Sequence, residues 1–328
     1  MIKIALDAMG GDNAPEALVA GASSAIQELP DLEIILVGQQ EIIQPILLKY
    51  PSERISVQNA SQIIGMDESP VSAVREKKDA SINVALKLLS EKKADAVVSA
   101  GNTGAFMSAA LFKLGRIPGV ERPAIAGVLP TRAGRVLCLD IGANSDNRPK
   151  HLQQFGEMGS LYAEHIFHIK SPKVGLLNIG EEPEKGNELT IAAYPLLKES
   201  PINFIGMVES KEVLGGNVDV VVCDGFVGNL MLKFCESVSY FVFDLLKKEF
   251  RKSLISKLAA FLLLPALKSI KKRVDYDEVG GAPILGVGGV CIKAHGRAKS
   301  KAIKNAIRVA HEAVKEDIIG CIKKVESR

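Results

Sequence analysis

Short apolar runs alternate with longer segments of helical periodicity along most of this chain. Runs rich in Val and Ile predict strands at residues 2–6, 32–37, 55–57, 96–98, 124–129, 136–139, 174–177, 202–208 and 218–222. The intervals predict helices, for example at residues 15–28, 81–91, 150–165, 188–199 and 230–249, with a last helix from about residue 300. Such alternation is typical of βαβ units, whose strands are buried on both faces. We therefore predict an α/β fold, a doubly wound, mostly parallel sheet with helices on both faces.

Five of the predicted strands end in clusters of Gly, Asn, Asp, Ser and Thr. These clusters cover residues 7–12, 99–104, 140–144, 178–180 and 223–229. In an open parallel sheet the carboxyl ends of the strands face one crevice, where glycine allows a close backbone approach and the following helix favours an anion. The pattern thus predicts one shared polar site built from five loops.

Two stretches depart from the alternation. Residues 251–273 are both basic and strongly apolar, which predicts a projecting amphipathic helical pair at about residues 250–274, with Pro265 breaking the helix. Residues 279–290 are rich in glycine and predict a hairpin that returns to the sheet. The sequence shows no internal repeat, low-complexity tract or flexible linker, so residues 1–328 are predicted to form a single two-lobed unit.

Composition narrows the function classes. With 328 residues, of which 47% are hydrophobic and 24% charged, the chain can bury a large core. The lack of Trp, an aromatic content of 5% and a net charge of only +3 argue against a nucleic-acid partner. The five cysteines lack metal or redox spacing and indicate a reducing cytosol. No leader precedes the first strand and no apolar stretch approaches the roughly 18 residues of a membrane span, which predicts a chain neither exported nor membrane-spanning.

Several common catalytic motifs are missing. The five histidines form no H-E-x-x-H or Cys/His pattern, so no metal site is predicted, and no G-x-S-x-G indicates a serine nucleophile. The first turn contains Gly10 and Gly11 but lacks the G-x-G-x-x-G spacing of a dinucleotide-binding loop. A ligand role and a tight turn capped by Asp12 or Asn13 explain this turn equally well.

Three other loops point to chemistry more directly. Residues 99–104 place an amide, hydroxyls and two glycines at a helix start, where they can hold phosphate without a charged side chain. Residues 180–187 surround Lys185 with three carboxylates, which makes Lys185 either part of a solvated charge run or a cation for phosphate or a developing oxyanion. Residues 224–229 offer a carboxylate, two glycines and the amide of Asn229, and a capped helix explains them as well.

Together these motifs resemble the bacterial phosphate acyltransferases of phospholipid synthesis, the PlsX family. The resemblance runs from the first strand to the C-terminal helix and rests on residues 5–12, 99–105, 178–182, 185–187, 224–229 and 280–283, with further similarity at residues 75–81 and 294–296. It implies transfer of a long-chain fatty acyl group from acyl carrier protein to inorganic phosphate, giving acyl phosphate for a downstream membrane acyltransferase. It further implies a homodimer, no cofactor, and a fold like that of phosphate acetyltransferase and the isocitrate dehydrogenase group.

The residues suit that reaction. Phosphate dianion is already a nucleophile, so the site needs positioning and a stabilised thioester oxyanion rather than a covalent intermediate. We assign Lys185, Asn229 and Asn102 as catalytic residues, the two asparagines donating to the same oxygen from opposite strand ends. The predicted substrate-binding residues are Asp7, Gly10, Gly11, Ser99, Gly101, Thr103, Gly104, Asn144, Asp224, Gly228 and His295.

The basic apolar segment predicts reversible contact with an anionic membrane surface. Its apolar face consists of Leu254, Ile255, Leu258, Phe261 and Leu262, extended by Leu263 and Leu264. The flanking cations are Lys252, Lys257, Lys268, Lys271, Lys272 and Arg273, each worth about 1 kcal/mol near anionic lipid. The chain is therefore expected in the cytoplasm, reversibly associated with the inner face of the cell membrane. The alternatives for this segment are packing in a dimer interface or docking of the acidic carrier protein.

Three other functions stay open at this point. The first is a phosphate acyltransferase that uses acyl-CoA, because acyl-CoA presents the same thioester group as the acylated carrier protein. A metal- and NAD-dependent dehydrogenase of related fold would need clustered aspartates, whereas Asp7, Asp140 and Asp224 lie on separate loops. A non-catalytic membrane-bound scaffold would explain the basic apolar segment but not the five polar strand ends.

Overall fold

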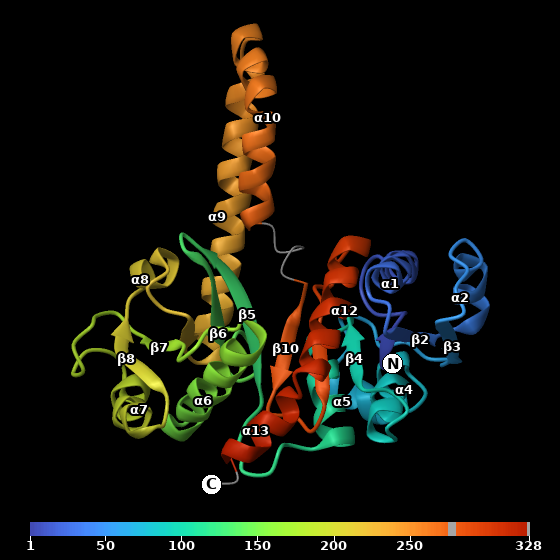
Figure 1. Cartoon of the computed structure of the whole chain (residues 1–328), viewed down its shortest axis with the longest axis horizontal. Coiled ribbons are helices and arrows are strands. Elements are labelled where there is room, and N and C mark those ends of the chain that lie inside the picture. Colours follow the sequence, from blue (N-terminus) through green and yellow to red (C-terminus); the bar gives the residue numbers. More distant parts are fainter. Residues whose placement is uncertain (275–279, 327–328) are drawn as a thin grey trace.

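A computed structural model describes residues 1–274 and 280–326, and the side chains of residues 1–270 and 280–325 (Figure 1). Eleven strands form one sheet in the order β3-β2-β1-β4-β11-β10-β5-β6-β9-β7-β8. The strands are β1 (Ile2–Asp7), β2 (Leu32–Gly38), β3 (Ile55–Asn59), β4 (Ala96–Ser99), β5 (Ala124–Thr131), β6 (Gly134–Leu139), β7 (Lys173–Leu177), β8 (Asn203–Val208), β9 (Val220–Val222), β10 (Ala282–Leu285) and β11 (Val290–Lys293).

Helices fill the intervals, as the periodicity predicts. They are α1 (Glu16–Glu28), α2 (Gln40–Leu47), α3 (Pro70–Glu76), α4 (Ser81–Ser90), α5 (Thr103–Leu114), α6 (Pro149–Ile166), α7 (Glu188–Glu199), α8 (Ser210–Gly215), α9 (Gly225–Arg251), α10 (Leu254–Val274), α12 (Ser300–Lys315) and α13 (Ile318–Glu326). The glycine-rich segment after α10 forms the predicted hairpin, β10 and β11, and α12 begins at the predicted residue.

The sheet is mostly parallel, which confirms the predicted fold class: seven of its ten pairings are parallel. The other three, β11–β10, β10–β5 and β5–β6, follow one another in the middle of the sheet. Short connections make the β10–β11 and β5–β6 hairpins antiparallel, and the β10–β5 pairing joins one hairpin to the other. Three reversals leave β6, β9 and β7 running opposite to β1 and β4, so the prediction that all five strand ends share one edge of a parallel sheet is wrong.

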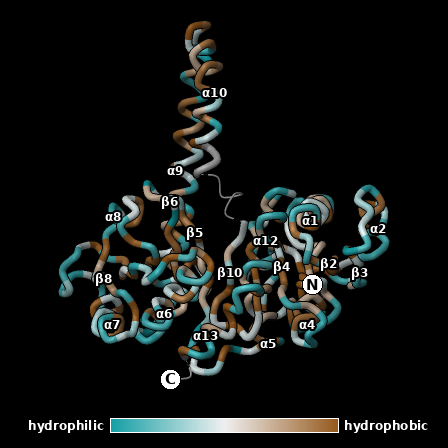
Figure 2. The backbone as a smooth tube through the Cα atoms, viewed as in Figure 1, coloured by the Kyte–Doolittle hydropathy of each residue, from teal (hydrophilic) through white to brown (hydrophobic). Residues whose placement is uncertain are grey.

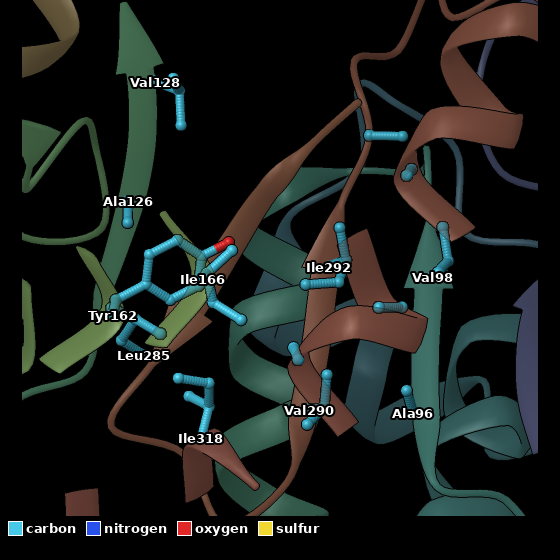
Figure 3. Packing of buried hydrophobic residues seen from close by; sticks show 14 of the residues in the cluster. Ala96, Val98, Ala126, Val128, Tyr162, Ile166, Leu285, Val290, Ile292 and Ile318 are labelled. Atoms are coloured by element: carbon cyan, nitrogen blue, oxygen red, sulfur yellow. The ribbon is translucent and has the colours of Figure 1, made fainter. Parts of the chain in front are cut away.

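The core lies on both faces of this sheet, because alternate residues of a buried strand point to opposite faces. Ile4 and Leu6 of β1 pack in one layer with α1 and α12, and Ala5 packs in the other with α4 and α5. At the centre of the molecule, Tyr162 of α6 lies close to Leu285 of β10 (Figure 3). The same sheet and core therefore run through both lobes.

Two long helices project from the body as a hairpin, α9 of 27 residues and α10 of 21 residues (Figure 1). Apolar residues recur along both (Figure 2). The predicted pair at residues 250–274 is therefore wrong in its bounds, since its first member is α9. Pro265 lies inside α10 and does not break it. Packing of α10 along α9 supports the helix across the one hydrogen bond that proline removes. The side chains of Lys271, Lys272 and Arg273 lie outside the described residues.

Within the described residues, α9 is also long and apolar enough to cross a membrane, with a mean hydropathy of 1.2 over 18 residues. The expectation that no stretch reaches that length is therefore wrong. Length and composition alone are weak evidence for a span, and the first turns of α9 are tied to the body, where Gly225, Gly228 and Leu232 are buried.

Candidate active site

Three of the polar loops lie side by side at one edge of the sheet. Strand β9 pairs in parallel with β6 on one side and β7 on the other. The loops that follow these strands, residues 140–144, 178–187 and 223–229, therefore start next to one another. Among the predicted catalytic residues, Lys185 and Asn229 both belong to this group.

The carboxylate of Asp140, which is fully buried, shapes the first of these loops. It accepts backbone N–H bonds from Ile125 at 3.1 Å, Gly142 at 3.0 Å, Ala143 at 2.9 Å and Asn144 at 2.7 Å. Burial raises the pKa of Asp140, and the bonds from Ala143, Asn144 and Gly142 act against that rise. This role of Asp140 was not predicted from the sequence, although an Asp directly after an apolar strand and two residues before Gly142 is its signal.

The predicted ligand residue Asn144 belongs to the same support. Its side-chain amide donates to the carbonyl oxygen of Pro123 at 2.8 Å and to Asp140 at 3.0 Å, and its own carbonyl accepts the N–H of Gly225 at 2.8 Å. The structure thus uses the Asn144 amide to tie the loop after β6 to the start of α9, which leaves no amide hydrogen for substrate.

The start of α9 packs directly on this loop. Asp224 caps the helix by accepting the N–H of Val227 at 2.9 Å. A Cβ at Gly228 would lie 1.9 Å from the carbonyl oxygen of Asp140, so only glycine fits there. The side chain of Asn229 lies about 3.5 Å from the place where a Cβ of Gly142 would be, and it makes no hydrogen bond within the described part of the chain. Its amide is therefore available to a ligand.

Lys185 lies on the loop after β7, where its side chain is 52% exposed. Its ammonium group contacts the carboxylate of Glu182 at 2.8 Å, and this bond raises the pKa of Lys185. Asn178 holds the loop closed by donating to the carbonyl oxygen of Lys185 at 2.8 Å. Because exposed ion pairs contribute little, the Lys185 ammonium can exchange Glu182 for an anionic substrate.

A second group of predicted residues gathers at the ends of β1, β4 and β11. The Asp7 carboxylate accepts a hydrogen bond from the Ser99 hydroxyl at 2.6 Å, and that hydroxyl accepts the N–H of Gly101 at 3.1 Å. A Cβ at Gly10 would lie 2.6 Å from the nitrogen of Gly101, so the two turns touch. Asp7 and Ser99 are buried, which means that their side chains support the glycine turns from below.

The loop that carries His295 joins this second group. The N–H of Asp12 donates to the carbonyl oxygen of Gly296 at 2.8 Å, and Gly11 adopts a φ of +97°, which favours glycine. Asn13 donates to the carbonyl oxygen of Arg297 at 3.1 Å instead of capping α1. The alternative of a turn capped by Asp12 or Asn13 is therefore wrong, because Pro15 occupies the N-cap position.

Asn102 stands at the start of α5, followed by Thr103 and Gly104, but its amide is already used. Its Oδ1 caps the helix by accepting the N–H of Ala105 at 3.0 Å. Its Nδ2 donates to the carbonyl oxygens of Met66 at 2.9 Å and Glu68 at 3.2 Å. The prediction that Asn102 and Asn229 donate to one substrate oxygen is therefore not supported, because Asn102 instead ties the loop at residues 65–68 to α5.

We predict that Asn102→Asp lowers the free energy of unfolding more than Asn102→Ala. Both variants lose the Nδ2 donors, and aspartate keeps the helix cap, but its negative charge lies against carbonyl oxygens, which costs about 1–3 kcal/mol and outweighs the cap. Denaturant unfolding of the two variants measures the difference. Equal stabilities would show that these contacts are not formed in solution.

Comparison with solved structures identifies the fold first. This fold is similar to a phosphotransacetylase from Streptococcus pyogenes, with a TM-score of 0.65, 17% sequence identity and coverage of 96% of this chain and 94% of that one. It is also similar to a branched-chain phosphotransacylase from Enterococcus faecalis V583, with a TM-score of 0.60, 14% identity and coverage of 96% and 99%. At these identities the likeness shows the fold alone, and it confirms the expected phosphate acetyltransferase-like architecture.

Sequence comparison then identifies the family. A family model described as fatty acid synthesis protein matches residues 2–320. Proteins named phosphate acyltransferase are 52% identical over 325 residues in Heliobacterium modesticaldum, covering 98% of this chain and 97% of the relative, and 49% identical over 326 residues in Halothermothrix orenii, covering 98% of each. The chain belongs to the phosphate acyltransferase family of fatty acid and phospholipid synthesis. The dehydrogenase and scaffold alternatives are thereby set aside.

Proposed function

We propose that this chain transfers a long-chain fatty acyl group from acyl carrier protein to inorganic phosphate, and that a membrane acyltransferase consumes the acyl phosphate. The observation that carries the proposal is the loop group after β6, β9 and β7. It offers a cation, Lys185, and the amide of Asn229 in the first turns of α9, which has no hydrogen-bond partner among the residues that the structure describes. An anionic nucleophile and a developing oxyanion need such donors.

In the proposed reaction a phosphate oxygen attacks the thioester carbonyl carbon. The new C–O bond forms, the carbonyl oxygen becomes an oxyanion, and collapse of that intermediate breaks the C–S bond and releases the carrier thiolate, which takes a proton from water. Lys185 and Asn229 would stabilise the phosphate and the oxyanion.

Acyl-CoA is the alternative donor, because it presents the same thioester. The test is phosphate-dependent release of free thiol from matched long-chain acyl thioesters of carrier protein and CoA. The proposal expects faster turnover with the carrier protein. A clear preference for acyl-CoA would show that acyl-CoA, and not the acyl carrier protein, is the acyl donor. Thiol release without phosphate would indicate a thioesterase.

We further propose that the tip of the α9–α10 hairpin binds the membrane surface reversibly from the cytoplasm. The tip residues on α10 are apolar and exposed, Leu254 by 82%, Leu258 by 62% and Phe261 by 68%. Leu262 and Leu264 are exposed as well. Each fully buried side chain of this size contributes about 1.5–3 kcal/mol, enough for surface binding when lysines lie nearby.

The double variant Leu258→Glu with Phe261→Glu is expected to lose co-sedimentation with anionic liposomes while keeping the soluble reaction. Two carboxylates on the tip oppose both apolar burial and the anionic surface. Leu48→Glu is the matched control, because Leu48 is 74% exposed on α2's C-terminal side, away from the hairpin. Unchanged liposome binding by the double variant would remove the membrane role.

The expected homodimer remains a proposal, and α9 offers a surface for it. An exposed apolar stripe runs along this helix at Phe226, Leu230, Phe234, Phe241 and Leu245. Helical spacing of four, four, seven and four residues places them on one face. We expect light scattering to give the mass of two chains, and Phe234→Glu with Phe241→Glu to give that of one. A monomeric parent chain would contradict this proposal.

A further inference from the structure

An apolar groove with a volume of about 690 Å³ lies between the two helices of the projecting hairpin, α9 and α10. Hydrophobic residues recur along both helices (Figure 2). The apolar walls of the groove are formed by Phe243, Leu246 and Phe250 of α9 and by Phe261, Leu264 and Leu267 of α10. Pockets that hold small molecules have volumes in this range and are also lined mainly by apolar side chains.

The groove is in line with the candidate active site. Asn229, Glu236, Phe243 and Phe250 recur at intervals of seven residues along α9, and seven residues are close to two helical turns. They therefore lie on one face of the helix, and the last three line the groove. At a rise of 1.5 Å per residue, the groove begins about 10 Å beyond Asn229.

The length of the groove fits a long acyl chain. On α9 its lining runs from Glu236 to Arg251, which corresponds to about 22 Å along the helix. The hydrocarbon core of a bilayer is about 30 Å thick, so the acyl chains of one leaflet span about 15 Å. The groove can therefore hold the whole chain of one long-chain acyl group.

The rim of the groove is basic. Four cations line it against a single carboxylate, that of Glu236, and the cations are Lys247, Arg251, Lys257 and Lys268. Among the side chains that the structure describes, none of these four makes an ion pair. An apolar groove with unpaired cations on its rim is complementary to an apolar chain that carries an anionic group.

The groove does not coincide with the apolar stripe that we assign to the homodimer. Phe243 lines the groove and follows Phe241 of the stripe by two residues, which is a rotation of about 200° around α9. The groove and the stripe thus lie on nearly opposite faces of this helix. A second copy packed on the stripe would leave the groove accessible.

We propose that this groove binds the chain of the long-chain acyl phosphate, while the cations of its rim face the phosphate. The inference rests on the proposed function, because that function supplies a long-chain acyl phosphate. It adds a site for the acyl chain outside the catalytic loops. Phe261 belongs both to the groove and to the apolar tip, so the bound chain lies along the hairpin between the active site and the membrane surface.

The test titrates the full-length protein with octyl, decyl and dodecyl phosphate in a calorimeter, below the concentrations at which they aggregate. These alkyl phosphates are stable and carry one apolar chain on a phosphate group. Burial of each added methylene should raise the affinity about fourfold. Leu246→Glu should lower the affinity for dodecyl phosphate by about tenfold or more, because its carboxylate lies in the groove and repels the phosphate.

Val242→Glu is the matched control, because Val242 lies on the same helix, is 45% exposed and lines neither the groove nor the stripe. It should keep the parent affinity. Leu246 is 37% exposed, so its variant should fold. Ala260→Phe fills the groove without adding a charge, and it should weaken binding of dodecyl phosphate more than binding of octyl phosphate.

An affinity that does not depend on chain length, or equal affinities in the parent and Leu246→Glu, would overturn the inference. Light scattering tests whether a second copy occupies the groove instead. Absence of dodecyl phosphate binding to the parent, together with a halved mass in Leu246→Glu, would show that a second copy covers the groove and would also overturn the inference.

Acyl phosphate formation by the parent protein is assayed separately, since alkyl phosphate binding needs no acyl donor. Failure of that assay with the expected dependence on chain length would overturn the proposed function and leave the groove as a site for anionic single-chain lipids. Normal acyl phosphate formation without binding of dodecyl phosphate would overturn the groove and leave the proposed function intact.

Discussion

Lys185→Ala is expected to lower turnover by about 10²- to 10³-fold, the usual effect of losing one contact to an oxyanion. The variant should remain folded, because Lys185 is half exposed and its ion pair with Glu182 lies on a surface loop. The effect is measured by steady-state kinetics with phosphate and the long-chain acyl thioester of acyl carrier protein as substrates. A loss mainly in kcat would place Lys185 at the oxyanion, and a loss mainly in the KM for phosphate would place it at the nucleophile.

Lys211 provides the matched control for this variant. It too is an exposed lysine with carboxylate neighbours, Glu209 at 3.3 Å and Glu181 at 3.4 Å, and it is not assigned to the site. Lys211→Ala should therefore keep near-parental activity. Near-full activity in Lys185→Ala would instead make Lys185 part of a solvated charge run.

Asn229→Asp is expected to harm activity more than Asn229→Ala. Alanine removes one amide donor, which we expect to cost about 10- to 100-fold, whereas aspartate also places a negative charge beside an anionic nucleophile. The difference between the two should be about tenfold and should appear mainly as a raised KM for phosphate. Asn203→Asp is the control, because Asn203 is exposed at the amino end of β8. Equal effects of Asp and Ala at position 229 would count against direct contact.

The sequence pattern predicted the strands well because Val- and Ile-rich runs must be buried on both faces of a sheet. It could not predict their directions. The pairing of β10 with β5 joins segments more than 150 residues apart, and nothing in either run specifies an antiparallel partner. The predicted bounds of the helical hairpin were wrong for a related reason, since the apolar pattern of α9 continues into α10. Pro265 predicted a helix end within α10, but packing against α9 keeps the helix continuous.

In the candidate site, sequence motifs identified Lys185, Asn229 and the glycines that allow close backbone contacts. The structural role of Asn102 could not be predicted, because its side-chain amide donates hydrogen bonds to carbonyl oxygens of a loop distant in sequence, residues 65–68.

Transfer of the acyl group to inorganic phosphate can be followed through the phosphate itself. The protein is incubated with the long-chain acyl thioester of acyl carrier protein and with isotopically labelled phosphate. The products are then separated, and the acyl phosphate is trapped with hydroxylamine. We predict label in an acyl phosphate that hydroxylamine converts to the acyl hydroxamate, with one carrier thiol released for each labelled product. Thiol release with free fatty acid and no labelled acyl phosphate would contradict it.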